Sequence, residues 1–174
     1  MSCTIYLVRH GIAALASADT QDSDRALTAE GTRKMTHAAM GLHRLDVVPE
    51  VVLSSPLRRA QETASVLASA LGPDVTVEIY QPLAPGSAPV EVLRGLRPYR
   101  TVHNLMLVGH QPDLGELASY LLTGSPELVP LPFKKGAIAA IEVATLPPRA
   151  NGVLRWFLTP KQLRAVGHTG QRRR

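Results

Sequence analysis

Several residue types that would point to particular functions are scarce in this chain of 174 residues. Cys3 is the only cysteine, which excludes an internal disulfide and argues against a cysteine-ligated metal site. Aromatic residues make up 4% of the chain, so stacking on exposed nucleic-acid bases is not expected. No apolar run is long enough to span a bilayer, and the N-terminus lacks a basic-then-apolar signal pattern. We therefore expect a cytoplasmic protein with no membrane partner.

Positive charge is concentrated at the C-terminus. The formal net charge is +5, and Arg172, Arg173 and Arg174 carry three of these charges. The rest of the chain is close to neutral, so no nucleic-acid partner is expected. The length and the ordinary apolar content fit one folded domain. We predict a single domain over residues 1–168 and a disordered basic tail over residues 169–174.

Strand-like and helix-like segments alternate along the chain, which is typical of α/β folds. Thr28 suits a helix N-cap, and the apolar residues after it recur at helical spacing, which predicts that they face the core: Met35, Ala38, Ala39, Leu42 and Leu45. Apolar runs predict strands over residues 5–8, 51–55, 75–80, 104–110, 137–144 and 153–159. Helices are expected near residues 28–44, 55–71, 90–96 and 112–122.

This order of elements predicts a three-layer α/β/α sandwich. Its central sheet should hold about six strands, mostly parallel, with helices on both faces. Pro56 and Pro112 are expected in the first turns of two of the helices, with Ser55 as the cap of the first one. No internal repeat or low-complexity segment interrupts the pattern.

Three of the predicted strands end at polar or cationic residues. Arg9 and His10 follow the first strand, Arg59 lies soon after the second, and His110 ends the fourth. The carboxyl ends of parallel strands meet at one edge of a sheet, so these side chains are expected to converge. Two arginines and two imidazoles with no evident carboxylate cluster would repel one another unless an anion belongs between them. Guanidinium groups match phosphate oxygens well.

The chemistry indicated is phosphoryl transfer, in which catalysis depends on positioning and charge stabilisation. The chain has no Walker A motif, which disfavours a nucleoside triphosphatase. Each residue also has a structural reading when it is taken singly. Arg9 could pair with a carboxylate, His10 could bond to a carbonyl, and Arg59 could pair with Glu62 on its own helix. Their joint occurrence at strand ends favours the site.

Four motifs, in order along the chain, resemble the histidine phosphatase superfamily, also called the RHG or phosphoglycerate mutase-like family. They are "LVRHG" at residues 7–11, "LT..G" at 27–31, "SSPLRRAQET" at 54–63 and "LVGHQPDLG" at 107–115. Together they cover much of the chain. "PLAPG" at 82–86 and "RWFLTPKQL" at 155–163 are similar to the small phosphohistidine phosphatases of the SixA type.

The resemblance implies roles for the converging residues. His10 would be the nucleophile that accepts the phosphoryl group, while Arg9 and Arg59 would hold the phosphate oxygens. His110 would complete the pocket as a further donor. In "LRRA" the arginine directly before alanine matches the family motif, so Arg59 is chosen and Arg58 is expected to be a surface charge. No cofactor or metal is expected, since the guanidinium groups supply the positive charge that magnesium supplies elsewhere.

One departure from the larger relatives concerns the general acid, which many of them carry after the third strand. Here the first acid in that region is Glu91, although Asp113 or Asp24 could fold inward. Imidazole leaves phosphorus more readily than a sugar alkoxide does, so a missing acid fits a phosphohistidine substrate. Arg25 has two equally supported interpretations: it binds the phosphate, or it simply pairs with Asp24.

The predicted function is a metal-independent phosphatase that works through a phosphohistidine intermediate. Its expected substrate is phosphohistidine in a signalling or phosphotransfer protein, such as a histidine-containing phosphotransfer domain or a phosphotransfer-system protein. A phosphatase for small phosphate esters or sugar phosphates is the first alternative. A catalytically idle phosphoprotein-binding module is the second. Lys134 and Lys135 could flank the pocket or simply protect an edge strand.

Overall fold

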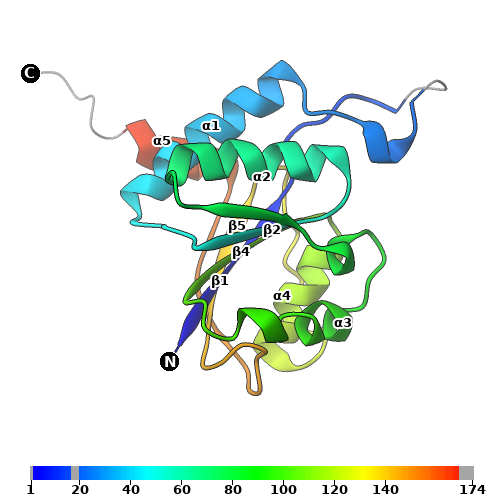
Figure 1. Cartoon of the computed structure of the whole chain (residues 1–174), viewed down its shortest axis with the longest axis vertical. Helices are drawn as coiled ribbons and strands as arrows, with labels where there is room; N and C mark the ends of the chain where they lie inside the picture. The colour runs from blue at the N-terminus through cyan, green and yellow to red at the C-terminus, as the bar shows by residue number, and fades with distance from the viewer. Residues whose placement is uncertain (1, 17–19, 169–174) are drawn as a thin grey trace, which may run out of the picture.

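The protein is a three-layer α/β/α sandwich around one six-stranded sheet (Figure 1). The computed structural model describes residues 2–16 and 20–168, so the predicted tail at 169–174 lies outside the described residues. The strand order is β3-β2-β4-β1-β5-β6. The strands are β1 (Cys3–Arg9), β2 (Val51–Ser54), β3 (Thr76–Ile79), β4 (Asn104–Gly109), β5 (Ile138–Val143) and β6 (Val153–Leu158).

The sheet is mixed but mostly parallel. β1 pairs with β4, and β2 pairs with both β3 and β4, in parallel. β5 runs antiparallel to both β1 and β6. Parallel pairing needs helical crossovers, whereas antiparallel neighbours do not, and this matches the short loop between the last two strands. The predicted architecture is confirmed.

Helices cover both faces of the sheet (Figure 1). They are α1 (Ala29–Arg44), α2 (Arg58–Leu71), α3 (Pro89–Arg94), α4 (Asp113–Thr123) and α5 (Pro160–His168), with short 3₁₀ turns η1 (Asp22–Asp24), η2 (Gln81–Leu83) and η3 (Arg97–Tyr99). Alternate residues of each strand point to opposite faces. Tyr6 and Val8 of β1 thus pack with α1 and α2, whereas Ile5 and Leu7 pack with α3 and α4.

The first helix follows the sequence prediction closely. The Thr28 hydroxyl accepts the N–H of Gly31 at 3.0 Å, as an N-cap should. Met35, Ala38, Ala39 and Leu42 are buried as expected. Leu45 is 37% exposed, which corrects its assignment to the core. It lies at the C-cap, where the helical spacing no longer applies.

The starts of α2 and α4 differ from the prediction, and α5 was missed. α2 begins at Arg58 with Leu57 as its N-cap, because the Ser55 hydroxyl accepts the N–H of Leu57 inside a preceding turn. α4 begins at Asp113, one residue after the proline. α5 was not predicted at all. It packs on α1 so closely that Gly41 faces the backbone of Leu163.

None of the helices in the described part of the chain has the length and the apolar composition that a membrane crossing requires.

Candidate active site

The candidate site lies at the carboxyl ends of three adjacent strands, β2, β4 and β1. The backbone N–H of His10 donates to the carbonyl of Gly109 at 3.1 Å, and the N–H of Ser55 donates to that of Val108 at 2.9 Å. These bonds extend the sheet ladder beyond the strand ends and hold the three segments side by side. The predicted convergence of the strand ends is therefore present.

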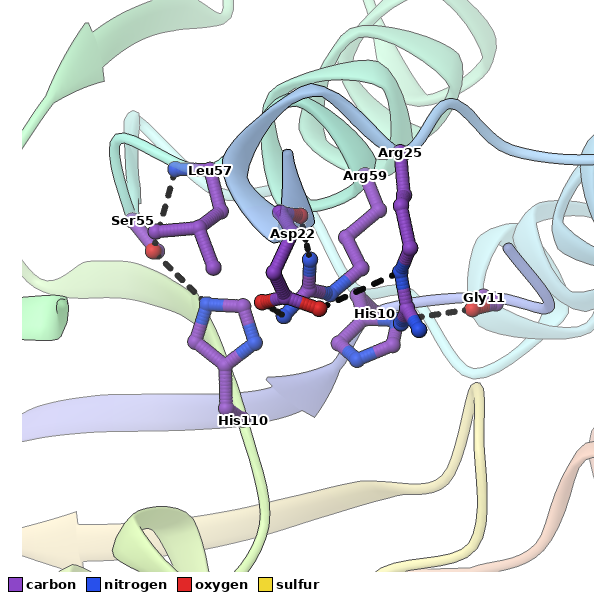
Figure 2. Close-up of polar contacts among 8 residues, drawn as sticks. All are labelled: His10, Gly11, Asp22, Arg25, Ser55, Leu57, Arg59 and His110. Atoms are coloured by element: carbon purple, nitrogen blue, oxygen red, sulfur yellow. Dashed lines mark hydrogen bonds and ion pairs between the residues drawn. The ribbon is translucent and has the colours of Figure 1, made fainter. Parts of the chain in front are cut away.

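Four of the predicted residues meet at this edge. His10, Arg59 and His110 are almost fully buried, with exposed fractions of 5%, 5% and 4%. The centroids of the two imidazole rings lie 5.1 Å apart. Arg9 is the last residue of β1, directly before His10, and its side chain is half-buried. Arg25 reaches in from the loop before α1 (Figure 2).

The ring of His10 is held in one tautomer. Its Nδ1 lies 2.7 Å from the carbonyl oxygen of Gly11. A carbonyl oxygen only accepts hydrogen bonds, so Nδ1 carries the proton and Nε2 keeps its lone pair. The N–H of Gly11 donates to the Thr63 hydroxyl at 3.0 Å, and that hydroxyl donates to the carbonyl of Arg59 at 2.6 Å. This chain of bonds couples the His10 segment to α2.

His10 is held neutral. Burial lowers its pKa to about 3, with further lowering by His110, Arg59 and Arg9, while the Gly11 carbonyl opposes the shift. A neutral imidazole with a free Nε2 is the nucleophilic form. Burial also contributes most to lowering the pKa of His110, which falls to about 4. The ring of His110 is therefore neutral at neutral pH.

His110 is oriented by a hydroxyl. Its Nε2 lies 2.7 Å from Ser55 Oγ, which also accepts the N–H of Leu57 at 3.3 Å. The Ser55 hydroxyl can donate its proton to His110 Nε2, and in that tautomer Nδ1 of the neutral ring carries the ring proton. That Nδ1 is buried without a hydrogen-bond partner.

Both arginines are fixed at one end of the guanidinium group. Nη1 of Arg9 donates to the carbonyl of Phe133 at 2.6 Å, and Nη1 of Arg59 donates to the carbonyl of Asp22 at 2.6 Å. The Nε atom of each is buried and has no hydrogen-bond partner. Buried donors are seldom left unpaired, so these two nitrogens are candidate donors to an anion.

Asp22 is a site residue that the sequence interpretation missed. Its carboxylate accepts Nη2 of Arg59 at 3.0 Å and lies 3.3 Å from Nε of Arg25. This corrects two expectations, since the cationic cluster does contain a carboxylate and Arg25 pairs with Asp22, not with Asp24. The signal was an acidic loop, "QDSD", but a loop has no periodicity from which to tell which acid turns inward.

The remaining candidates lie at the periphery. Arg58 is a surface charge as predicted, with 58% of its side chain exposed and its Nε 2.7 Å from Glu62. Lys134 and Lys135 are exposed on the loop before β5, which contacts the site through its backbone. The N–H of Gly136 donates to the carbonyls of Arg9 and His10.

The three candidate acids are not equivalent. Glu91 and Asp24 are exposed. Asp113 lines a small, largely apolar cleft together with His110 and Leu83, and its Oδ1 accepts the N–H of Gly86 at 3.2 Å. No group of three or more metal-ligating side chains occurs within residues 2–16 and 20–168.

Several known proteins are similar to this chain in sequence and in fold. The family described as Histidine phosphatase superfamily (branch 1) matches residues 5–83. An uncharacterized protein of Picosynechococcus sp. is 41% identical over 123 residues, which cover 69% of this chain and 73% of that protein. The phosphohistidine phosphatase SixA of Escherichia coli is 30% identical over 166 residues, covering 92% of this chain and 96% of SixA.

The fold comparison agrees with the sequence comparison. The structure of the protein histidine phosphatase SixA complexed with tungstate is similar, with a TM-score of 0.80, 29% identity, and coverage of 92% of this chain and 99% of that one. The four motifs, the sheet topology and these relatives lead to one assignment. The chain belongs to the histidine phosphatase superfamily and is a phosphatase of the SixA-like kind.

Proposed function

We propose that this phosphatase dephosphorylates phosphohistidine in a protein, through a covalent phosphohistidine intermediate on His10. Arg9 and Arg59 bind the phosphate oxygens through their Nε edges, and His110 donates to a third oxygen from Nδ1. Arg25 supports the same charge from the loop before α1. The substrate protein is of the phosphotransfer type, a histidine-containing phosphotransfer domain or a phosphotransfer-system protein. Such an enzyme acts in the cytoplasm.

The observation that carries the proposal is a set of buried nitrogens without hydrogen-bond partners next to the lone pair of His10 Nε2. Nε of Arg9, Nε of Arg59 and Nδ1 of His110 are buried and lack hydrogen-bond partners. His10 Nε2 is the neighbouring nucleophile, since Nδ1 is committed to Gly11. A tetrahedral oxyanion supplies acceptors to all three donors at once. The relative SixA was determined with tungstate, which is such an anion.

Among the described residues, the site offers no strong proton donor for a leaving group, and this favours phosphohistidine over sugar phosphates as the substrate. Burial and the arginines keep the two imidazoles neutral, so neither is a strong proton donor at neutral pH. Glu91 is exposed on α3. A sugar alkoxide needs a proton as it leaves, and a general acid is typically worth about 10²–10⁴-fold in rate. An imidazole leaving group has less need of one. The relative in E. coli is named a phosphohistidine phosphatase.

The test begins with the wild-type enzyme on a panel of phosphohistidine proteins, N-phosphoimidazole and sugar phosphates, with released phosphate measured. We expect the highest kcat/KM on a phosphohistidine protein. A preference for sugar phosphates would favour the small-ester alternative. No turnover of any substrate by a protein that still binds phosphohistidine proteins would favour the binding module.

The His10→Ala variant tests the intermediate. We expect it to fold and to lose turnover entirely, because removing the nucleophile removes the pathway. Rapid quenching of the wild-type enzyme with a ³²P-labelled substrate should trap a label on His10 that is acid-labile and alkali-stable. His43→Ala, a histidine on the outward part of α1, is the matched control and should retain both activity and label.

A further inference from the structure

The carboxylate of Asp22 occupies the solvent side of the site. It lies on η1, with 62% of its side chain exposed, directly over the buried guanidinium of Arg59. Figure 2 shows its carboxylate joined by dashed lines to both Arg59 and Arg25, with the two imidazoles on either side. It is close enough to His110 to raise the pKa of that ring, in opposition to the arginines. A substrate side chain that approaches Arg59 from this exposed side meets this carboxylate.

Asp22 does not fill the anion position. It takes the Nη end of Arg59, with its carbonyl on Nη1 and its carboxylate on Nη2. The Nε edge of Arg59 points elsewhere and stays unpaired. A guanidinium group offers five N–H donors in a planar fork, so one end can be anchored while the other binds an oxyanion. Asp22 and a phosphoryl group can therefore contact Arg59 together.

Asp22 is an acceptor and not an acid. A hydrogen bond from Arg59 lowers the pKa of its carboxyl, burial opposes that shift, and the positive charges of Arg59 and Arg25 lower the pKa further, with His110 as the other titratable neighbour. These are the charged and titratable groups that face it from α2, its own loop and the end of β4. At neutral pH it is ionised, so it can accept an N–H but has no proton to give.

Transfer of phosphorus between two imidazoles makes the same demand on both rings. His10 attacks through Nε2 while its Nδ1–H stays bonded to the Gly11 carbonyl. A new N–P bond forms, and the bond from phosphorus to the substrate nitrogen breaks with its electron pair going to that nitrogen. If the distal nitrogen of the substrate ring is protonated, the ring leaves as neutral imidazole and no proton need move. The distal N–H of the substrate therefore needs an acceptor, as that of His10 does.

We propose that the Asp22 carboxylate accepts the distal N–H of the substrate imidazole and holds that ring in its protonated, readily leaving form. This role rests on the proposed function, since it presupposes a phosphohistidine substrate. It makes Asp22 a specificity-determining residue that favours leaving groups with an N–H over phosphate esters, which have no such proton. Charge-assisted hydrogen bonds of this kind are about twice as strong as neutral ones.

The experiment compares two small substrates that carry the same phosphoryl group. N-phosphoimidazole has a distal nitrogen that can be protonated, whereas p-nitrophenyl phosphate leaves as a stable phenolate and offers no N–H. Asp22→Asn keeps the shape and one acceptor for Arg59 but removes the negative charge. Asp24→Asn makes the same change two residues away, at an exposed position in the same turn, and serves as the control.

We expect Asp22→Asn to lower kcat/KM for N-phosphoimidazole by about tenfold or more, below the 10²–10³-fold typical of a preorganised buried donor because Asp22 is largely exposed. The alkaline limb of the pH–rate profile for that substrate should move to lower pH, because the bound ring loses its proton more easily. Turnover of p-nitrophenyl phosphate should fall by a clearly smaller factor, set by the weaker anchoring of Arg59, and Asp24→Asn should change neither substrate.

Equal losses on both substrates would show that Asp22 only positions Arg59, and would overturn the inference while leaving the phosphohistidine assignment intact. An unshifted alkaline limb would overturn it in the same way. Failure of the wild-type enzyme to hydrolyse N-phosphoimidazole and phosphohistidine proteins, with p-nitrophenyl phosphate still turned over, would instead overturn the proposed function itself.

Discussion

Arg58 and Arg59 form a natural matched pair, because they are adjacent in sequence and differ in almost every structural respect. The Arg59 side chain is nearly buried, is anchored to Asp22 and has an unpaired Nε. The Arg58 side chain is mostly exposed and pairs with Glu62 one helical turn away. The perturbation is the substitution of each by alanine, with activity measured on N-phosphoimidazole and on a phosphohistidine protein.

The expected magnitudes differ by about two orders of magnitude. Removing one preorganised, desolvated donor from a transferring group typically costs 10²–10³-fold in rate, or about 2.7–4 kcal/mol. We expect this loss for Arg59→Ala. Exposed i, i+4 pairs contribute about 0.3–0.5 kcal/mol, so Arg58→Ala should change kcat/KM by less than about twofold. Glu62 still accepts the N–H of Leu27 at 2.6 Å in that variant, so the loop stays anchored.

Arg59→Lys separates charge from geometry. Lysine keeps the positive charge but cannot bond to Asp22 and to a phosphate through two edges of one planar group. We expect it to recover only a small part of the activity. Circular dichroism and thermal unfolding should show that all three variants fold. Equal losses for Arg58→Ala and Arg59→Ala, or full activity in Arg59→Lys, would refute the assignment of Arg59 to the anion site.

Three further predictions test the site and the fold. The pKa values of His10 and His110 are about 3 and 4 in the folded state against about 6.5 unfolded, so their neutral forms stabilise the protein above pH 6.5 and that stability is lost as the pH falls toward 4. Urea unfolding at pH 7 and pH 4.5 should show a drop of about 2–3 kcal/mol per imidazole, and His10→Gln should reduce it; an identical drop in this variant would contradict the burial argument. Ser55→Ala removes the partner of His110 Nε2 and should lower kcat about tenfold, as expected for a lost buried hydrogen bond; Ser54→Ala, which loses only a bond to the Ser55 carbonyl, is the control. Gly41→Ala would place a methyl group against the backbone of Leu163 and should destabilise the protein by at least about 1–3 kcal/mol, while Gly72→Ala, which has space for a methyl group, should not; equal melting temperatures would mean that α5 does not pack on α1 as described.

Most of the fold was predictable because its signals are local. Apolar runs placed six strands, and the N-cap at Thr28 and the helical spacing after it placed α1. α5 escaped prediction because it has 9 residues, few of them apolar, although Thr159 and Pro160 form a helix-start signal that was overlooked. Its buried residues are Leu163 and Gly167, both of which lie against α1. A short helix with one large apolar anchor gives little periodicity to recognise.

The sequence by itself determined that Arg9, His10, Arg59 and His110 would meet, because the strand ends of a parallel sheet share one edge. Only the tertiary structure decided how they are used. The Gly11 carbonyl selects the tautomer of His10, and the 3₁₀ turn brings Asp22 to Arg59, which is 37 positions away. Such contacts depend on the path of an aperiodic loop, and loops carry no pattern that relates one side chain to another. The identity of the residues follows from local chemistry, whereas their charge states and orientations follow from burial and from neighbours that are distant along the chain.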